Sequence, residues 1–126
     1  MSVARHGPSE PQLHRLIAEV ASASGPAGPK RAALAFAIAG CMGTDVAFIL
    51  AKGRFAFRAL RAHLVADRAQ EDPHRFVRVN LRFVVEGTLP ADAVERAIAL
   101  SREKYCSVWH SMRQDIDFTV SFELIA

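Results

Sequence analysis

The chain has two cysteines, Cys41 and Cys106, and their thiols are the side chains best suited to carry chemistry. A thiol attacks a peroxide only as the thiolate. Because the reference pKa of cysteine is about 8.5, an active cysteine needs a nearby cation or hydrogen-bond donors to ionise it. Asp45 lies one helical turn after Cys41 and would oppose ionisation if both side chains share a face. Taken alone, Cys41 therefore fits core packing better than catalysis.

Other chemistry has weaker support in the sequence. His63, His74 and His110 do not have zinc-ligand spacing with either cysteine. The chain also has no Gly-rich phosphate loop and no nucleophile elbow. The sequence therefore predicts no metal site and no cofactor, and Asp45 is interpreted as a helix-surface or hydrogen-bonded residue rather than a general base.

Length and composition favour a single globular domain over residues 1–126. The chain has 126 residues, of which 51% are hydrophobic, enough for a substantial core. The net charge is only +3 and the basic residues are interspersed, which indicates a solvated surface rather than a nucleic-acid partner. Residues 1–9 lack the apolar stretch of a secretory signal, so we expect a cytoplasmic location. Structural disulfides are rare there, so the two cysteines are either inert small hydrophobes or redox-active thiols.

The segment from Lys30 to Lys52 must position Cys41. Between Ala32 and Leu50 it is apolar almost all round. A helix that is apolar on every side is buried in a protein core or a membrane. Asp45 interrupts the run and leaves an uncharged stretch too short to span a bilayer. The pattern therefore predicts a buried central helix, with Cys41 near its middle.

Apolar periodicity predicts the remaining elements. The expected elements are a short amphipathic helix from a capping box at Ser9–Gln12 to about Ala21, strands at 60–67 and 77–86 that form an antiparallel hairpin, a helix that opens at Pro90 and ends before Cys106, and a last strand over 116–124. Each strand has one apolar face. A few antiparallel strands wrapped on a buried helix predict an α+β domain.

Two stretches around the cysteines resemble a known family. Ala37–Cys41 with Thr44–Val46, and later Glu103–Val108, are similar to the osmotically inducible protein C and organic hydroperoxide resistance (OsmC/Ohr) family. The resemblance runs from about Pro29 to Leu124 and makes residues 1–28 a divergent N-terminal segment. It implies an α+β fold with an antiparallel sheet around a buried central helix. It also implies an intertwined homodimer with active sites at the subunit interface.

The same resemblance implies a thiol-dependent peroxidase that reduces organic hydroperoxides in the oxidative-stress response. In that family the cysteine of the central helix becomes a sulfenic acid, which carries over to Cys41. The later cysteine, here Cys106, condenses with the sulfenic acid to a disulfide that a dithiol reduces. The implied partners are a second copy of the chain, an organic hydroperoxide and a dithiol reductant, without nucleic acid, membrane or cofactor.

The chain departs from the family pattern near the start of the central helix. Family peroxidases carry an acidic residue about ten positions before the peroxidatic cysteine, which orients a thiolate-stabilising arginine, but this chain reads Lys30-Arg31-Ala32. Arg31 is a poor substitute, because ten helical residues place it about 15 Å from Cys41. Two alternatives follow: a non-enzymatic dimeric binding domain of the same fold, or a redox sensor that forms a Cys41–Cys106 disulfide without turnover.

Overall fold

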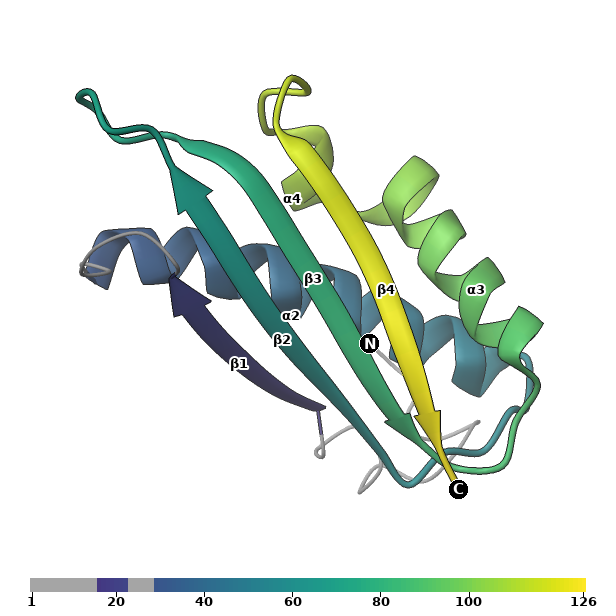
Figure 1. The fold of residues 1–126 in the computed structure, drawn as a ribbon. Coiled ribbons are helices and arrows are strands. Elements are labelled where there is room, and N and C mark those ends of the chain that lie inside the picture. The colour runs from purple at the N-terminus through teal and green to yellow at the C-terminus, as the bar shows by residue number, and fades with distance from the viewer. Residues whose placement is uncertain (1–15, 23–28) are drawn as a thin grey trace.

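The computed structural model describes residues 16–22 and 29–126. Their elements, in chain order, are β1 (Leu16–Ser22), α2 (Pro29–Lys52), β2 (Ala59–Arg68), β3 (Phe76–Glu86), α3 (Ala91–Leu100), the π-helix η2 (Ser101–Tyr105), α4 (Ser107–His110) and β4 (Asp117–Ile125). The four strands form one sheet in the order β1-β2-β3-β4. Figure 1 shows α2 crossing one face of this sheet, with α3 and α4 beside β4. The described chain is therefore α+β, as predicted.

The sheet is mixed, so the prediction of an antiparallel sheet is correct only for its central hairpin. β2 and β3 pair antiparallel, but β1 runs parallel to β2 and β3 runs parallel to β4. The connections explain the difference. The chain passes through α2 between β1 and β2, and through α3, η2 and α4 between β3 and β4. Such crossovers return the chain to the end of the sheet where it started, so the joined strands run in the same direction.

The prediction of an N-terminal helix reaching about Ala21 is wrong, because β1 is a strand that pairs with β2 over its whole length. Leu16, Ala18 and Val20 alternate as in a strand, while Leu16 and Val20, four residues apart, would also share one face of a helix. An apolar run this short does not distinguish a helix from a strand. Pairing with the edge of β2 satisfies the backbone of this segment and decides between the two conformations. The expected capping box at Ser9–Gln12 lies outside the described residues.

Helix α2 packs one side against the sheet. Its buried residues on that side include Ala35, Ile38, Ala39, Met42, Val46 and Leu50. Leu34 is 38% exposed and Phe36 49% exposed, so the predicted burial on all sides is wrong for a single chain. By length and composition alone, Ala33–Lys52 could cross a membrane, a test that the core helix of a soluble protein also passes. A helix with one buried side and exposed large apolar residues on another has surface left to cover.

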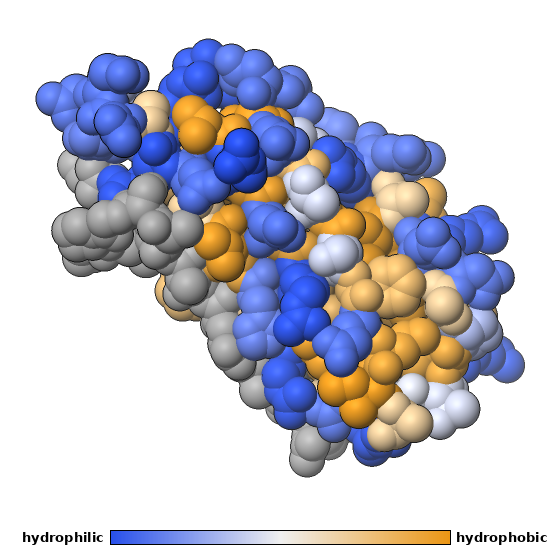
Figure 2. All heavy atoms as spheres, viewed as in Figure 1, coloured by the Kyte–Doolittle hydropathy of each residue, from blue (hydrophilic) through white to orange (hydrophobic). Residues whose placement is uncertain are grey.

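The core lies between α2 and the sheet. The predicted alternation holds, with one side of each central strand buried: Leu60, Ala62, Leu64 and Ala66 on β2, and Val79, Leu81, Phe83 and Val85 on β3. Helix α3 adds Val94, Ala97 and Ile98 to this core. The other sheet face carries ion pairs such as Arg61–Glu86 and Arg78–Asp67. Figure 2, viewed from the strand side, shows polar residues interspersed with apolar ones.

Gly87 ends the central hairpin in a conformation that needs glycine. Its φ is +155°, and an added Cβ would lie 2.9 Å from Phe57 Cα and 3.1 Å from the Ala56 carbonyl oxygen. We expect Gly87→Ala to lower the free energy of unfolding by about 2–4 kcal/mol, because backbone strain and a backbone clash add. Urea unfolding measures this. The matched control is Thr88→Ala at the exposed next position, expected within about 0.5 kcal/mol of wild type. Equal effects of the two substitutions would contradict this prediction.

Candidate functional site

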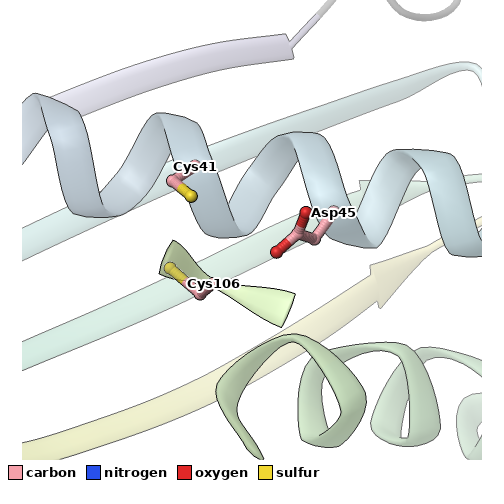
Figure 3. Close-up of side chains that lie close together, drawn as sticks. All are labelled: Cys41, Asp45 and Cys106. Atoms are coloured by element: carbon pink, nitrogen blue, oxygen red, sulfur yellow. The ribbon is translucent and has the colours of Figure 1, made fainter. Parts of the chain in front are cut away.

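The fold brings Cys41 and Cys106 together. Helix α2 carries Cys41 near its middle, and Cys106 lies between η2 and α4. The two sulfurs and a carboxylate oxygen of Asp45 all lie within 4.8 Å of one another. Figure 3 shows the three side chains converging on the space between α2 and the segment of Cys106. Both cysteines are free thiols. The short distances between these side chains mean that two positions far apart in the sequence form one site.

The two thiols differ in access. Cys41 is partly exposed, and its Sγ lies 3.9 Å from the Ser107 hydroxyl oxygen. Cys106 is fully buried. A molecule that arrives from solvent therefore meets the Cys41 sulfur first.

Local backbone structure holds Cys106 in place. The π-helix η2 ends there, and the Cys106 N–H donates to the Ser101 carbonyl at 2.7 Å. Cys106 is also the N-cap of α4, where its sulfur accepts a hydrogen bond from the Trp109 N–H at 3.5 Å. The sulfur thus satisfies one of the N–H groups that a helix start leaves without a partner. Its position is set by both helical segments.

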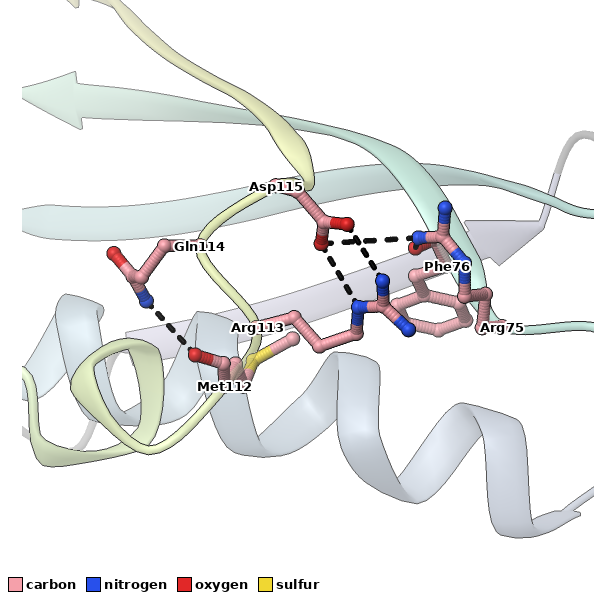
Figure 4. Close-up of polar contacts among 6 residues, drawn as sticks. All are labelled: Arg75, Phe76, Met112, Arg113, Gln114 and Asp115. Carbon is pink, nitrogen blue, oxygen red and sulfur yellow. Dashed lines mark hydrogen bonds and ion pairs between the residues drawn. The ribbon is translucent and has the colours of Figure 1, made fainter.

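The loop after α4 contacts the C-terminal end of that short helix. The Gln114 side-chain amide donates to the carbonyls of Trp109 and Met112, at 3.0 and 2.9 Å. Next to it, Arg113 makes two hydrogen bonds to Asp115, at 2.8 and 2.6 Å (Figure 4). These contacts fix the end of α4 and, through it, the N–H group that holds the Cys106 sulfur.

Asp45 is held beside the sulfurs by Ser101. The Ser101 hydroxyl donates to Asp45 Oδ2 at 2.7 Å, and Ser101 is fully buried. The spacing of Cys41 and Asp45, four residues apart on one helix, was the sequence signal that both share a face. The partnership with Ser101 joins positions 56 apart and had no such signal. Of the two interpretations that the sequence left for Asp45, the hydrogen-bonded one therefore holds, and the residue lies at the site.

The surroundings of Cys106 favour its protonated form. The pKa of Cys106 is raised to about 11, mainly by burial and also by the neighbouring Cys41 and Asp45, against the lowering effect of the Trp109 N–H. No basic side chain of the described residues contributes to that shift. The first turn of α2 has no acidic residue, so the carboxylate that orients an arginine in the family pattern is missing there. Cys106 is therefore a neutral thiol at pH 7.

The raised pKa of Cys106 predicts a pH dependence of stability. The folded state holds this proton more tightly than the unfolded state, in which a cysteine has a pKa of about 8.5–9. The free energy of unfolding should therefore be unaffected by this group below pH 9 and fall between about pH 9 and 11, by on the order of 2 kcal/mol. Urea unfolding of reduced, chelator-treated protein measures the slope. Cys106→Ala removes the titrating group, so an equal slope in that variant would contradict the prediction.

A cavity of about 720 Å³ opens beside Asp45. Its walls are largely apolar, with Phe48, Ile49, Phe55 and Leu100 among the lining residues. Arg96 and Lys52 also line it, as do Pro90, Asp92 and Tyr105. The thiol site thus has an apolar space beside it that is large enough for an organic group.

Taken together, the fold and the site define an α+β protein in which two free thiols from distant segments meet beside a carboxylate. The chain belongs to the OsmC-like protein family, whose model matches residues 31–121. Protein YhfA of Escherichia coli K12 is 41% identical over 91 residues, which cover 71% of this chain and 68% of YhfA.

Solved structures agree on the fold. A hypothetical protein from Aquifex aeolicus VF5 has 28% sequence identity and a TM-score of 0.73, over 82% of this chain and 77% of that one. An organic hydroperoxide resistance protein OsmC from Legionella pneumophila, also described as a predicted redox protein, has 15% identity and a TM-score of 0.61, over 80% and 72%. At that identity the second likeness speaks for the fold alone.

Proposed function

We propose that this protein is a thiol-dependent peroxidase that reduces organic hydroperoxides through Cys41 and Cys106. The observation that carries the proposal is the meeting of two free thiols of unequal exposure: Cys41 is accessible and Cys106 is buried behind it. Membership of the OsmC-like family adds support, because a hydroperoxide resistance protein shares the fold. The unequal exposure supports Cys41 as the attacking thiol and Cys106 as the resolving one.

The first step oxidises Cys41. Its thiolate attacks the outer oxygen of the hydroperoxide, the O–O bond breaks, and the sulfur becomes a sulfenic acid. The alkoxide takes up one proton and leaves as the alcohol. Two electrons pass from the sulfur to the peroxide.

The second step joins the two cysteines. The Cys106 sulfur attacks the Cys41 sulfenic acid, an S–S bond forms, and the released hydroxide takes the Cys106 proton and leaves as water. The sulfurs lie within 4.8 Å of one another and a disulfide requires about 2.05 Å, so the side chains must approach. Because Cys106 is protonated at neutral pH, its proton must be removed, and Asp45, a base within the same cluster, would take it and pass it to the departing hydroxide. A dithiol then reduces the disulfide and restores both thiols.

The cavity beside Asp45 supports an organic substrate. Its apolar lining residues would accept the carbon chain or ring of a hydroperoxide, whereas hydrogen peroxide would leave that surface empty. We therefore infer a preference for bulky apolar hydroperoxides over hydrogen peroxide. The reaction fits a role in the oxidative-stress response of the cytoplasm, without nucleic-acid or membrane partners.

We also infer an intertwined homodimer. Leu34 and Phe36 are exposed on α2 and leave apolar surface on the same helix that carries Cys41. A second copy would cover that surface and place part of the partner near each site.

Phe36→Ser is expected to weaken this dimer. Loss of a buried phenylalanine costs about 1.5–3 kcal/mol per copy, so the dissociation constant should rise at least about a hundredfold. Light scattering across a dilution series measures it. Val65→Ser is the matched control, because Val65 is 42% exposed on β2, away from α2. A wild-type monomer at micromolar concentration, or equal dimers in wild type and Phe36→Ser, would contradict the inference.

A redox sensor is the second candidate function. The observation in its favour is that burial, together with Cys41 and Asp45, raises the pKa of Cys106, which slows resolution and disfavours rapid turnover. A sensor would form the disulfide once and resist reduction by added dithiols. A non-enzymatic binding domain would form no disulfide at all.

The decisive assay supplies reduced protein with cumene hydroperoxide and excess dithiothreitol and follows peroxide loss. A peroxidase consumes many equivalents per chain, with the alcohol as product. Consumption that stops at one equivalent favours the sensor. No consumption above the protein-free rate would refute both redox functions.

A further inference from the structure

The three groups of the thiol site are also potential metal ligands. Cys41 and Asp45 project from one face of α2 at a spacing of four residues, and Cys106 faces them from the far side (Figure 3). Their ligand atoms, two sulfurs and one oxygen, lie within 4.8 Å of one another. Around a tetrahedral zinc ion with Zn–S bonds of about 2.3 Å, two sulfurs are about 3.8 Å apart. The two sulfurs would therefore need to move closer together by about 1 Å to bind one zinc ion.

The charges of the site favour a cation. The two sulfurs and the Asp45 carboxylate lie within 4.8 Å of one another, so their deprotonated forms repel one another. Two thiolates and a carboxylate carry three negative charges, and a divalent ion would reduce this to one. A bound cation reverses the electrostatic cost of ionising the thiols.

The surrounding hydrogen bonds suit metal ligands. Ser101 donates to Oδ2 of Asp45 and leaves Oδ1 available, and the Trp109 N–H donates to the Cys106 sulfur. Such outer contacts orient ligands and support their charge. The Ser107 hydroxyl oxygen, 3.9 Å from the Cys41 sulfur, or a solvent molecule could fill a fourth position.

We propose that the reduced protein binds one zinc-class divalent ion through Cys41, Asp45 and Cys106. Two sulfurs and one carboxylate oxygen are a donor set for a borderline-soft ion rather than for Mg²⁺ or Ca²⁺. Binding forms two metal–sulfur bonds and releases the thiol protons to solvent, with no change in oxidation state. Metal and hydroperoxide compete for the same thiols, and the disulfide form has no thiolate left to bind.

Cobalt(II) tests the site, because cobalt–thiolate bonds absorb in the near ultraviolet. Reduced full-length protein, freed of metal by a chelator, is titrated with Co²⁺ under anaerobic conditions. We expect a charge-transfer band that saturates at one ion per chain, with up to two protons released per ion, and that disappears when Zn²⁺ is added. Asp45→Asn should weaken binding by about tenfold or more. Cys106→Ser should weaken it further and lower the band intensity.

The controls separate this site from adventitious binding and from peroxidase activity. His110→Ala, at an exposed position, should bind Co²⁺ as wild type does, and wild type oxidised to the disulfide should show no band. Absence of the band in reduced wild type at millimolar Co²⁺, or unchanged affinity in both Asp45→Asn and Cys106→Ser, would overturn the proposal. The titration contains no peroxide, so a protein that binds Co²⁺ without reducing hydroperoxides refutes only the proposed function. A protein that reduces them without binding Co²⁺ refutes only the ion site.

Discussion

Replacing Cys41 with serine is expected to reduce hydroperoxide consumption to the protein-free rate, a fall of at least about a thousandfold. Cys41 supplies the sulfur that takes the oxygen atom, and a serine hydroxyl cannot be oxidised in its place. The partly exposed position on α2 accepts serine without a buried unpaired group. Peroxide loss with cumene hydroperoxide and dithiothreitol measures the effect.

Thr44→Ala is the matched control for Cys41→Ser, because Thr44 is exposed on the same helix, three residues on. It should retain the wild-type rate. If Cys41→Ser keeps more than about a tenth of that rate, the assignment of Cys41 as the attacking thiol is wrong.

Replacing Cys106 with serine is expected to leave the first oxidation intact and to stop normal recycling. The Cys41 sulfenic acid would then lack its resolving partner, so it would persist and advance to the sulfinic acid with excess peroxide. Turnover with a dithiol should fall by at least about tenfold and decline during the assay. Mass spectrometry of the Cys41 peptide should show one added oxygen at one equivalent of peroxide and two at high excess.

The Cys106→Ser variant should fold, because serine is a preferred N-cap and can accept the Trp109 N–H as the cysteine sulfur does. Ser111→Ala, at an exposed position after α4, is the control and should recycle like wild type. Stable multiple turnover in Cys106→Ser, with no oxidised Cys41 peptide, would contradict the role of Cys106.

The elements that the sequence predicted well are those with long, unambiguous periodicity. The hairpin of β2 and β3, helix α3 and strand β4 all lie close to their predicted ranges. The parallel pairings were not predictable in this way, because strand direction depends on the crossovers and not on the alternation within a strand. β1 was mistaken for a helix because its seven residues are too few to separate the two periods.

The site was predictable only in part. Family resemblance singled out Cys41 and Cys106, and no periodicity or spacing would have paired them across 65 positions. Asp45 could be placed beside Cys41 from helical spacing. The hydrogen bond from Ser101 to Asp45 depends on how the segment after α3 packs on α2, which is a tertiary feature.

The most direct test is the oxidation product of the reduced, chelator-treated protein with one equivalent of cumene hydroperoxide. Proteolysis without reducing agent, followed by mass spectrometry, identifies the linked cysteines. We predict loss of both free thiols, one equivalent of cumyl alcohol and a peptide pair joined through Cys41 and Cys106. Two unmodified thiols with the peroxide still present, or a linkage of Cys41 only to Cys41 of a second copy, would contradict the proposed redox pair.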